Sequence, residues 1–147
     1  MAVSQVLTNL YLGNQYSTTI TDVDTIISIG CNSKNKTREG IPINHYKFSI
    51  KDSDESVLTE IYEESSKIIH QELQNHNKVL VHCKGGINRS PMIIIAYLCR
   101  YSHYSIQDAI NHVKSVRKGA RIQPHYLEQL EHWIENIEKN LITKHTA

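Results

Sequence analysis

Residues 79–91 read VLVHCKGGINRSP, and this stretch decides the fold of the chain. The nearly continuous apolar run over residues 78–82 predicts a short strand in the middle of a sheet that is covered on both faces. Ser90 and Pro91 then predict a helix start, with Ser90 as the N-cap and Pro91 at the first helical position. Because the seven residues 83–89 connect the two elements, the sequence predicts a strand–loop–helix unit.

The connecting loop has the chemistry of an anion site. Gly85 and Gly86 allow consecutive backbone N–H groups to point into one concavity, and the helix start adds the positive end of a dipole. Arg89 stands at the end of the loop, where a guanidinium can clamp two phosphate oxygens. The same surroundings lower the pKa of a thiol well below about 8.5, so Cys83 is predicted to be a thiolate. A thiolate in a phosphate site predicts nucleophilic attack and a phospho-cysteine intermediate.

Two other interpretations of this loop explain less of it. A buried, inert cysteine is common in proteins, but it accounts for neither the adjacent glycines nor the arginine six residues after Cys83. A nucleotide-binding P-loop ends in Gly-Lys followed by Ser or Thr, and this loop does not. The loop therefore predicts catalysis on a phosphate group.

The rest of the chain predicts the other layers of one domain. Strands followed by a strand–loop–helix unit and two further helices describe an α/β or α+β domain. The chain contains no repeat or linker, so residues 1–147 are expected to form a single domain. The segment 31–42 is polar and is expected to be an exposed loop. The predicted strands are 10–13, 25–29, 44–50 and 78–82, and the predicted helices are 57–75, 90–98, 105–116 and a last one from Pro124.

Composition narrows the class of protein. Sixteen basic residues nearly balance fifteen acidic ones, so net charge predicts no nucleic-acid or membrane partner. The three cysteines, Cys31, Cys83 and Cys99, match no disulfide framework or paired zinc motif, which favours a reducing compartment. The first residues have no signal-peptide pattern. The protein is therefore expected in the cytoplasm, in the nucleus as well, or in a host cytosol if it is viral.

The signature His82-Cys83, five residues, then Arg89-Ser90 resembles that of the protein tyrosine phosphatase superfamily. The run 79–91, continuing through residues 96–98, is similar to the small dual-specificity phosphatases. Residues 6–13 resemble the first strand of that family, and Ala109, Val113, Arg117 and residues 122–130 resemble its C-terminal helices. The resemblance covers nearly the whole chain. It implies an α/β fold with a central, mostly parallel or mixed sheet of about five strands flanked by helices, and phosphate monoester hydrolysis without a cofactor.

The resemblance also implies roles for particular residues. Cys83 would be the nucleophile and Arg89 the phosphate clamp. Ser90 would donate a hydrogen bond to the Cys83 sulfur and help it leave during hydrolysis of the intermediate. His82 would fix the loop and help to lower the thiol pKa. The backbone N–H groups that would cradle the phosphate belong to Lys84, Gly85, Gly86, Ile87, Asn88 and Arg89.

The general acid is expected on a separate loop, after the strand at 44–50. Expelling an alkoxide or phenolate requires protonation, normally by a carboxylic acid. Asp52 follows the strand directly, where members of the family carry their acid, and is the predicted donor. Asp54 is the alternative acid or a helix cap, and Glu55 is expected in the first turn of the next helix.

Other chemistry-bearing residues are given smaller roles. The nine histidines show neither the i, i+4 spacing around a glutamate nor a Cys-x-x-Cys companion, so no metal site is predicted. Cys31 and Cys99 are open candidates for a reversible disulfide with Cys83. The remaining basic cluster is expected to be a solvated helix end and loop, with help in binding an anionic substrate as the alternative; its members are Lys114, Arg117, Lys118 and Arg121. The oligomeric state is left open.

Four hypotheses concern what the protein acts on or binds. The short chain leaves little room for the insertions that deepen the pocket of larger tyrosine-specific relatives, which favours phosphorylated proteins carrying phosphotyrosine, phosphoserine or phosphothreonine. The Asn88-Arg89 pair resembles the loop of RNA 5′-phosphatases, but the loop of those enzymes continues Thr-Gly where this chain has Ser90-Pro91. The near-neutral net charge of the chain also disfavours RNA. A phosphoprotein-binding pseudophosphatase would lack the cysteine, the arginine or the acid, and this chain has candidates for all three. Phosphoinositides are disfavoured because Lys84 is the one lysine of the loop.

Overall fold

The computed structural model describes residues 3–14, 22–30, 37–38, 41–50, 57–83 and 89–146. Within these residues a five-stranded sheet has the order β1-β2-β7-β3-β6. The β1–β2 pair is antiparallel, and β2, β7, β3 and β6 pair in parallel. The strands are β1 (Val3–Leu7), β2 (Leu10–Gly13), β3 (Thr25–Ile29), β6 (Asn44–Phe48) and β7 (Val79–Cys83). The predicted α/β fold with a mostly parallel, mixed sheet is confirmed.

The central strand is the one that the sequence placed in the middle of the sheet. β7 pairs with β2 on one side and with β3 on the other, and all five of its residues are buried. Successive side chains of a strand point to opposite faces. Val79 and Val81 therefore join the main core, while Leu80 joins a smaller cluster on the other face.

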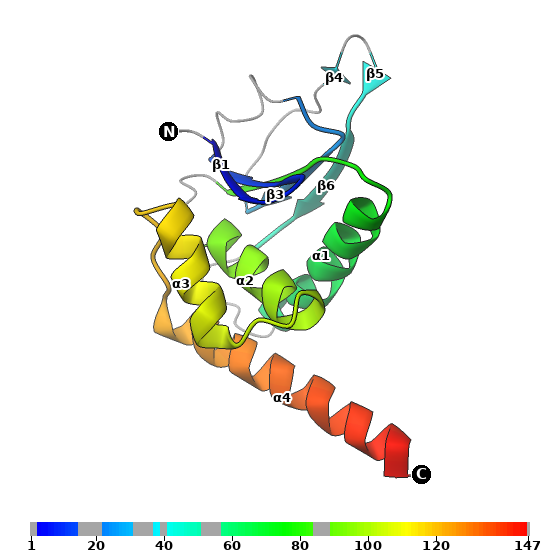
Figure 1. Ribbon diagram of the computed structural model, residues 1–147, viewed down its shortest axis with the longest axis vertical. Coiled ribbons are helices and arrows are strands. Elements are labelled where there is room, and N and C mark those ends of the chain that lie inside the picture. The colour runs from blue at the N-terminus through cyan, green and yellow to red at the C-terminus, as the bar shows by residue number, and fades with distance from the viewer. Residues whose placement is uncertain are drawn as a thin grey trace.

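The helices of the described residues gather on one side of the sheet, with α2 between α1 and α3 (Figure 1). The apolar helix α2 is buried from Ser90 to Leu98, as its sequence predicts. The last helix crosses below the others, and its C-terminal end extends past the body of the molecule (Figure 1). The helices are α1 (Val57–Gln74), α2 (Arg89–Tyr101), α3 (Ile106–Val116) and α4 (Pro124–Thr146). Among the described residues, no helix is long and apolar enough to cross a membrane.

Some element boundaries differ from the sequence prediction, and others confirm it. Helix α2 begins at Arg89, so Ser90 lies in the first turn and is not the N-cap. The prediction for α3 is confirmed, since Ser105 caps the helix and accepts a hydrogen bond from the Asp108 N–H at 3.1 Å. The segment expected to be a loop contains a small antiparallel pair, β4 (Thr37–Arg38) with β5 (Ile41–Pro42). Strand β1, which the sequence did not predict separately, forms an edge beside β2.

Candidate active site

The site residues meet at the carboxyl ends of two adjacent parallel strands. In the register of β3 with β7, Ser28 is level with His82 and Ile29 with Cys83. Gly30 follows the end of β3, and α2 begins with Arg89. In open α/β sheets, ligands bind outside the carboxyl ends of the strands. The tertiary structure therefore brings the predicted nucleophile to the edge where a substrate is expected.

Cys83 and Ser90 face each other across the loop that joins β7 to α2. The distance from Cys83 Sγ to Ser90 Oγ is 3.2 Å, and both side chains are buried. When the sulfur is a thiolate it has no proton, so the Ser90 hydroxyl must be the donor. The helical position of Ser90 turns its hydroxyl toward the sulfur, which is the contact that the family resemblance implied.

Arg89 is held by a residue that the sequence treated only as the end of a strand. Its Nη1 donates a hydrogen bond to the carbonyl oxygen of Gly30 at 3.3 Å. Gly30 has a φ of 65°, and a Cβ built there would collide with Arg89 Nη1. Glycine is thus favoured by the backbone conformation, and a Cβ at this position would also force the Arg89 guanidinium to move. A lone glycine after a strand gave no signal of this role.

His82 lies beneath the nucleophile within a hydrogen-bonded row of side chains. Its Nε2 is 2.6 Å from Ser28 Oγ, which is also 2.6 Å from His45 Nε2. Burial lowers the pKa of His82 to about 4, the nearby His45 lowers it as well, and a hydrogen bond with the Cys83 backbone acts in the opposite direction. His82 is therefore neutral at neutral pH.

The basic cluster after α3 divides into two kinds of residue. Lys114, Lys118 and Arg121 are exposed, as the sequence predicted. Arg117 departs from that prediction. Its Nη1 donates to the Leu12 carbonyl at 3.2 Å and to Ser4 Oγ at 3.3 Å.

Besides these two hydrogen bonds, Arg117 interacts electrostatically with Cys83. Burial lowers the pKa of its guanidinium, and an electrostatic interaction with Cys83 raises it. An arginine remains protonated in either case. The sequence could suggest a role toward an anionic substrate only for the whole cluster, because nothing in the local pattern distinguishes Arg117 from its solvated neighbours.

Some predicted site residues lie outside the described residues. They are Asp52 with the alternatives Asp54 and Glu55, Cys31, and the phosphate-loop residues Lys84, Gly85, Gly86, Ile87 and Asn88. Their roles stay predictions. Within the described part of the chain, no three His, Cys, Asp or Glu side chains are grouped as metal ligands. Cys99 is a half-buried free thiol, and burial raises its pKa to about 11.

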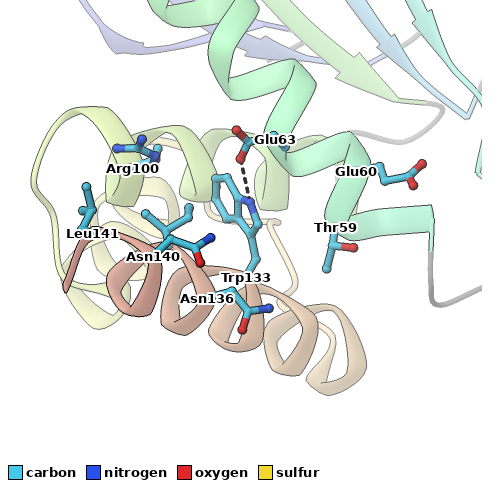
Figure 2. Close-up of a pocket in the computed structure, with 9 residues that line it drawn as sticks. Thr59, Glu60, Glu63, Arg100, Trp133, Asn136, Asn140 and Leu141 are labelled. Atoms are coloured by element: carbon cyan, nitrogen blue, oxygen red, sulfur yellow. Dashed lines mark hydrogen bonds between the residues drawn. The ribbon is translucent and has the colours of Figure 1, made fainter. Parts of the chain in front are cut away.

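A pocket of about 490 Å³ lies between α1 and α4, away from the predicted nucleophile. Figure 2 shows Trp133 at its centre, with the indole Nε1 donating to Glu63 Oε2 at 2.9 Å. Arg100 and Leu141 stand at one end, and Thr59 and Glu60 line the side formed by α1 (Figure 2). Its described lining includes none of Cys83, Arg89 and Ser90.

Comparisons with known proteins point to one family. The family model described as the dual specificity phosphatase catalytic domain matches residues 10–136. A protein of Invertebrate iridescent virus 6 named as a tyrosine phosphatase, 123R, is 35% identical over 144 residues, which cover 92% of this chain and 96% of that protein. Human dual specificity protein phosphatase 9 is 30% identical over 128 residues, 83% of this chain but 33% of that longer protein.

Solved structures share the fold. The crystal structure of human DUSP28 superposes with a TM-score of 0.81 at 21% identity, covering 94% of this chain and 96% of that one. The structure of DUSP15 gives a TM-score of 0.77 at 27% identity, over 90% of this chain and 86% of that one.

Proposed function

Because the chain belongs to the dual-specificity phosphatase catalytic domain family, we propose that it hydrolyses phosphate monoesters on phosphotyrosine, phosphoserine and phosphothreonine of proteins. The observation that carries the proposal is the 3.2 Å contact between Cys83 Sγ and Ser90 Oγ, beside the first residue of α2, Arg89. A buried sulfur that meets a hydroxyl at a helix start has a donor for its thiolate form. This arrangement supports a nucleophilic cysteine.

The first step transfers the phosphoryl group to the protein. The Cys83 thiolate attacks phosphorus, an S–P bond forms and the P–O bond of the substrate breaks. Asp52 gives its proton to the departing oxygen, so the leaving group departs as a neutral alcohol or phenol. Arg89 holds two phosphate oxygens, and the backbone N–H groups of residues 84–89 hold the others.

The second step releases phosphate. Asp52, now a carboxylate, takes a proton from water while the water oxygen attacks phosphorus. The S–P bond breaks, and the Cys83 sulfur leaves as a thiolate. Ser90 stabilises that thiolate by donating its hydroxyl proton in a hydrogen bond, which supports a role in this step more than in the first.

Proteins are favoured as the substrates over RNA. Two relatives carry names that describe tyrosine or dual-specificity protein phosphatases. Both types of substrate, aryl and alkyl phosphates, therefore belong to the proposal. We place the enzyme in the cytoplasm, because its cysteine pattern favours a reducing compartment. We propose a single domain that uses no cofactor, because the proposed chemistry needs only side chains and backbone groups of the chain.

An aryl phosphate assay with a Cys83→Ser variant tests the proposed reaction. The native protein is expected to release phosphate without added metal, and Cys83→Ser is expected to lose essentially all turnover because serine is not ionised at neutral pH. Turnover that survives in Cys83→Ser contradicts the mechanism. No turnover by the native protein supports a phosphate-binding pseudophosphatase instead.

A substrate-trapping experiment tests the substrate class. Cys83→Ser or Asp52→Ala protein, incubated with lysate, is expected to retain proteins that carry phosphotyrosine and phosphoserine or phosphothreonine. The Cys83→Ser, Arg89→Ala double variant is the matched control, since it lacks the phosphate clamp. Recovery of triphosphorylated RNA rather than phosphoproteins transfers the proposal to RNA.

The assignment of Asp52 has its own test. Asp52→Asn is expected to lower kcat by about 10²–10⁴-fold for a substrate with a poor leaving group, because an amide donates no proton to the oxygen. A substrate with an acidic phenol as leaving group is expected to lose much less. Asp54→Asn is the control, and the larger loss in that variant would move the role of general acid to Asp54.

A further inference from the structure

Three adjacent parallel strands contribute one side chain each to a row beneath the nucleophile. His45 comes from β6, Ser28 from β3 and His82 from β7. The two Nε2–Oγ distances are both 2.6 Å. Ser28 and His82 are fully buried, and His45 is half-buried at the edge of the sheet. The row thus connects an edge strand with the residue that precedes Cys83.

A hydroxyl has a single proton, so the direction of the two hydrogen bonds is coupled. If Ser28 donates to His82, it is free to accept from His45; if it donates to His45, it accepts from His82. Which ring nitrogen carries the proton is therefore decided for both histidines together.

The contact between His82 and Cys83 selects one direction. The hydrogen bond with the Cys83 backbone favours the protonated ring, so the ring is its donor and the Cys83 carbonyl its acceptor. Since Nε2 faces Ser28, the donor is Nδ1. A neutral imidazole has one N–H group, which leaves His82 Nε2 as an acceptor. Ser28 must then donate to His82 and accept from His45 Nε2–H.

We propose that His45 and Ser28 are positioning residues for the nucleophile, acting through a directed chain from His45 Nε2–H to Ser28 Oγ–H to His82 Nε2. The chain holds His82 in the tautomer whose Nδ1–H binds the Cys83 carbonyl. That bond fixes the backbone from which the attacking sulfur projects. The proposal rests on the proposed function, because it assigns these residues to the reaction of Cys83.

The direction does not depend on the charge of His45. Nε2 of His45 carries a proton both in the required neutral tautomer and in the imidazolium form, so it donates to Ser28 in either state. Burial and the charge of Lys47 on the same strand lower the pKa of His45. His82 is the other titratable ring in contact with Ser28. The hydrogen bonds from His45 through Ser28 to His82 are therefore expected to keep one direction across neutral pH.

A matched pair of substitutions at His45 tests the direction. Glutamine can donate an N–H to Ser28, whereas glutamate of nearly the same shape only accepts. We expect His82 Nε2 to be unprotonated in the native protein and in His45→Gln, as measured by ¹⁵N NMR of the imidazole ring. In His45→Glu the two hydrogen bonds through Ser28 reverse their direction, and Nε2 of His82 becomes protonated. A protonated Nε2 in the native protein, or an unchanged ring in His45→Glu, overturns the proposal.

The same pair is expected to differ at Cys83. His45→Glu should move the pH midpoint of Cys83 alkylation by iodoacetamide upward by roughly half a unit to one unit, and lower kcat for an aryl phosphate about threefold to tenfold. His45→Gln should stay near native. In a Ser28→Ala background the two variants should no longer differ, because the hydroxyl that transmits the direction is gone. A difference that persists there shows that the charge of glutamate acts without the chain, and contradicts the proposal.

Failure of this proposal is distinguishable from failure of the proposed function. The ring ¹⁵N spectrum of the native protein needs neither a folded variant nor catalysis. If Cys83-dependent turnover is present while His82 carries its proton on Nε2, only the positioning chain is refuted. If Cys83→Ser keeps full turnover, the proposed function is refuted whatever the tautomer.

Discussion

The carboxyl end of β7 and the pocket between α1 and α4 are two polar regions built in opposite ways. Around Cys83 the polar side chains are buried and bind one another: His82, Ser28 and Ser90 are each 0% exposed. Around the pocket of about 490 Å³, the polar side chains lie mostly at the rim of a buried tryptophan, and Glu60, Asn136 and Asn140 are exposed. The pocket between α1 and α4 and the predicted chemistry are therefore in different places.

This difference shows which feature identifies a reactive site in this fold. A polar group without a partner is costly to bury, so a buried row of mutually bonded polar side chains is maintained at the expense of apolar packing. Polar groups at a rim remain in contact with water and need no partner. Substitutions at the Cys83 end should therefore change catalysis, and those at the pocket should change stability only.

The largest contrast is expected between two arginines. Arg89→Lys should lower kcat/KM by about 10²–10³-fold, because a lysine keeps the charge but loses the fork that binds two phosphate oxygens. Arg100→Lys, at the pocket, should leave kcat/KM within about twofold and slightly weaken a contact with Tyr101, whose ring centre is 4.9 Å away. Steady-state kinetics on an aryl phosphate measures both. Equal losses in the two variants would remove the contrast.

The next largest effect on kcat/KM is expected from a comparison of two glycine substitutions. Gly30→Ala should lower kcat/KM by roughly 10- to 100-fold, since alanine at a φ of 65° is strained by about 1–3 kcal/mol and its Cβ displaces Arg89. Gly119→Ala is the control, because a Cβ there meets no described atom within 4 Å. A KM that rises for Gly30→Ala but not for Gly119→Ala supports the role of Gly30. Native kinetics in Gly30→Ala would show that Arg89 does not depend on it.

Substitutions at Arg117 distinguish the effect of its charge from the effect of its position. Arg117→Gln should lower kcat/KM about fivefold and shift Cys83 alkylation to higher pH, because it removes a cation that interacts with the thiolate. The effect is modest because water partly screens this interaction. Arg117→Lys should recover part of the loss. Lys118→Gln, which removes an exposed charge one residue away, should change neither quantity. If Lys118→Gln and Arg117→Gln behave alike, the cluster acts only through its net charge.

The smallest effect on catalysis is expected at the pocket. Trp133→Phe removes the hydrogen bond from the indole to Glu63 and should lower the free energy of unfolding by about 1 kcal/mol, as measured by denaturant titration. The value of kcat/KM should remain within about twofold. A tenfold loss of kcat/KM with unchanged stability would show that the two regions are coupled.

The parts that the sequence predicted are those encoded by short spacings. The start of α4 at Pro124, the cap of α3 at Ser105 and the buried strand before Cys83 were read from neighbouring residues, and all three are confirmed. The capping role of Ser90 was wrong, since the same residue types serve both a helix start and a contact with a nearby sulfur. Local pattern does not separate those two uses.

The sequence by itself determined the reactive loop, because Cys83, Arg89 and Ser90 lie within eight residues on one strand–loop–helix unit. Tertiary structure alone decided which distant residues hold that loop's ends. Gly30 meets Arg89 59 positions later in the chain, Ser28 meets His82 54 positions later, and Arg117 reaches back 105 positions to Leu12. Such partners are set by strand order and register, which bring carboxyl ends together in space without leaving a local pattern in the chain.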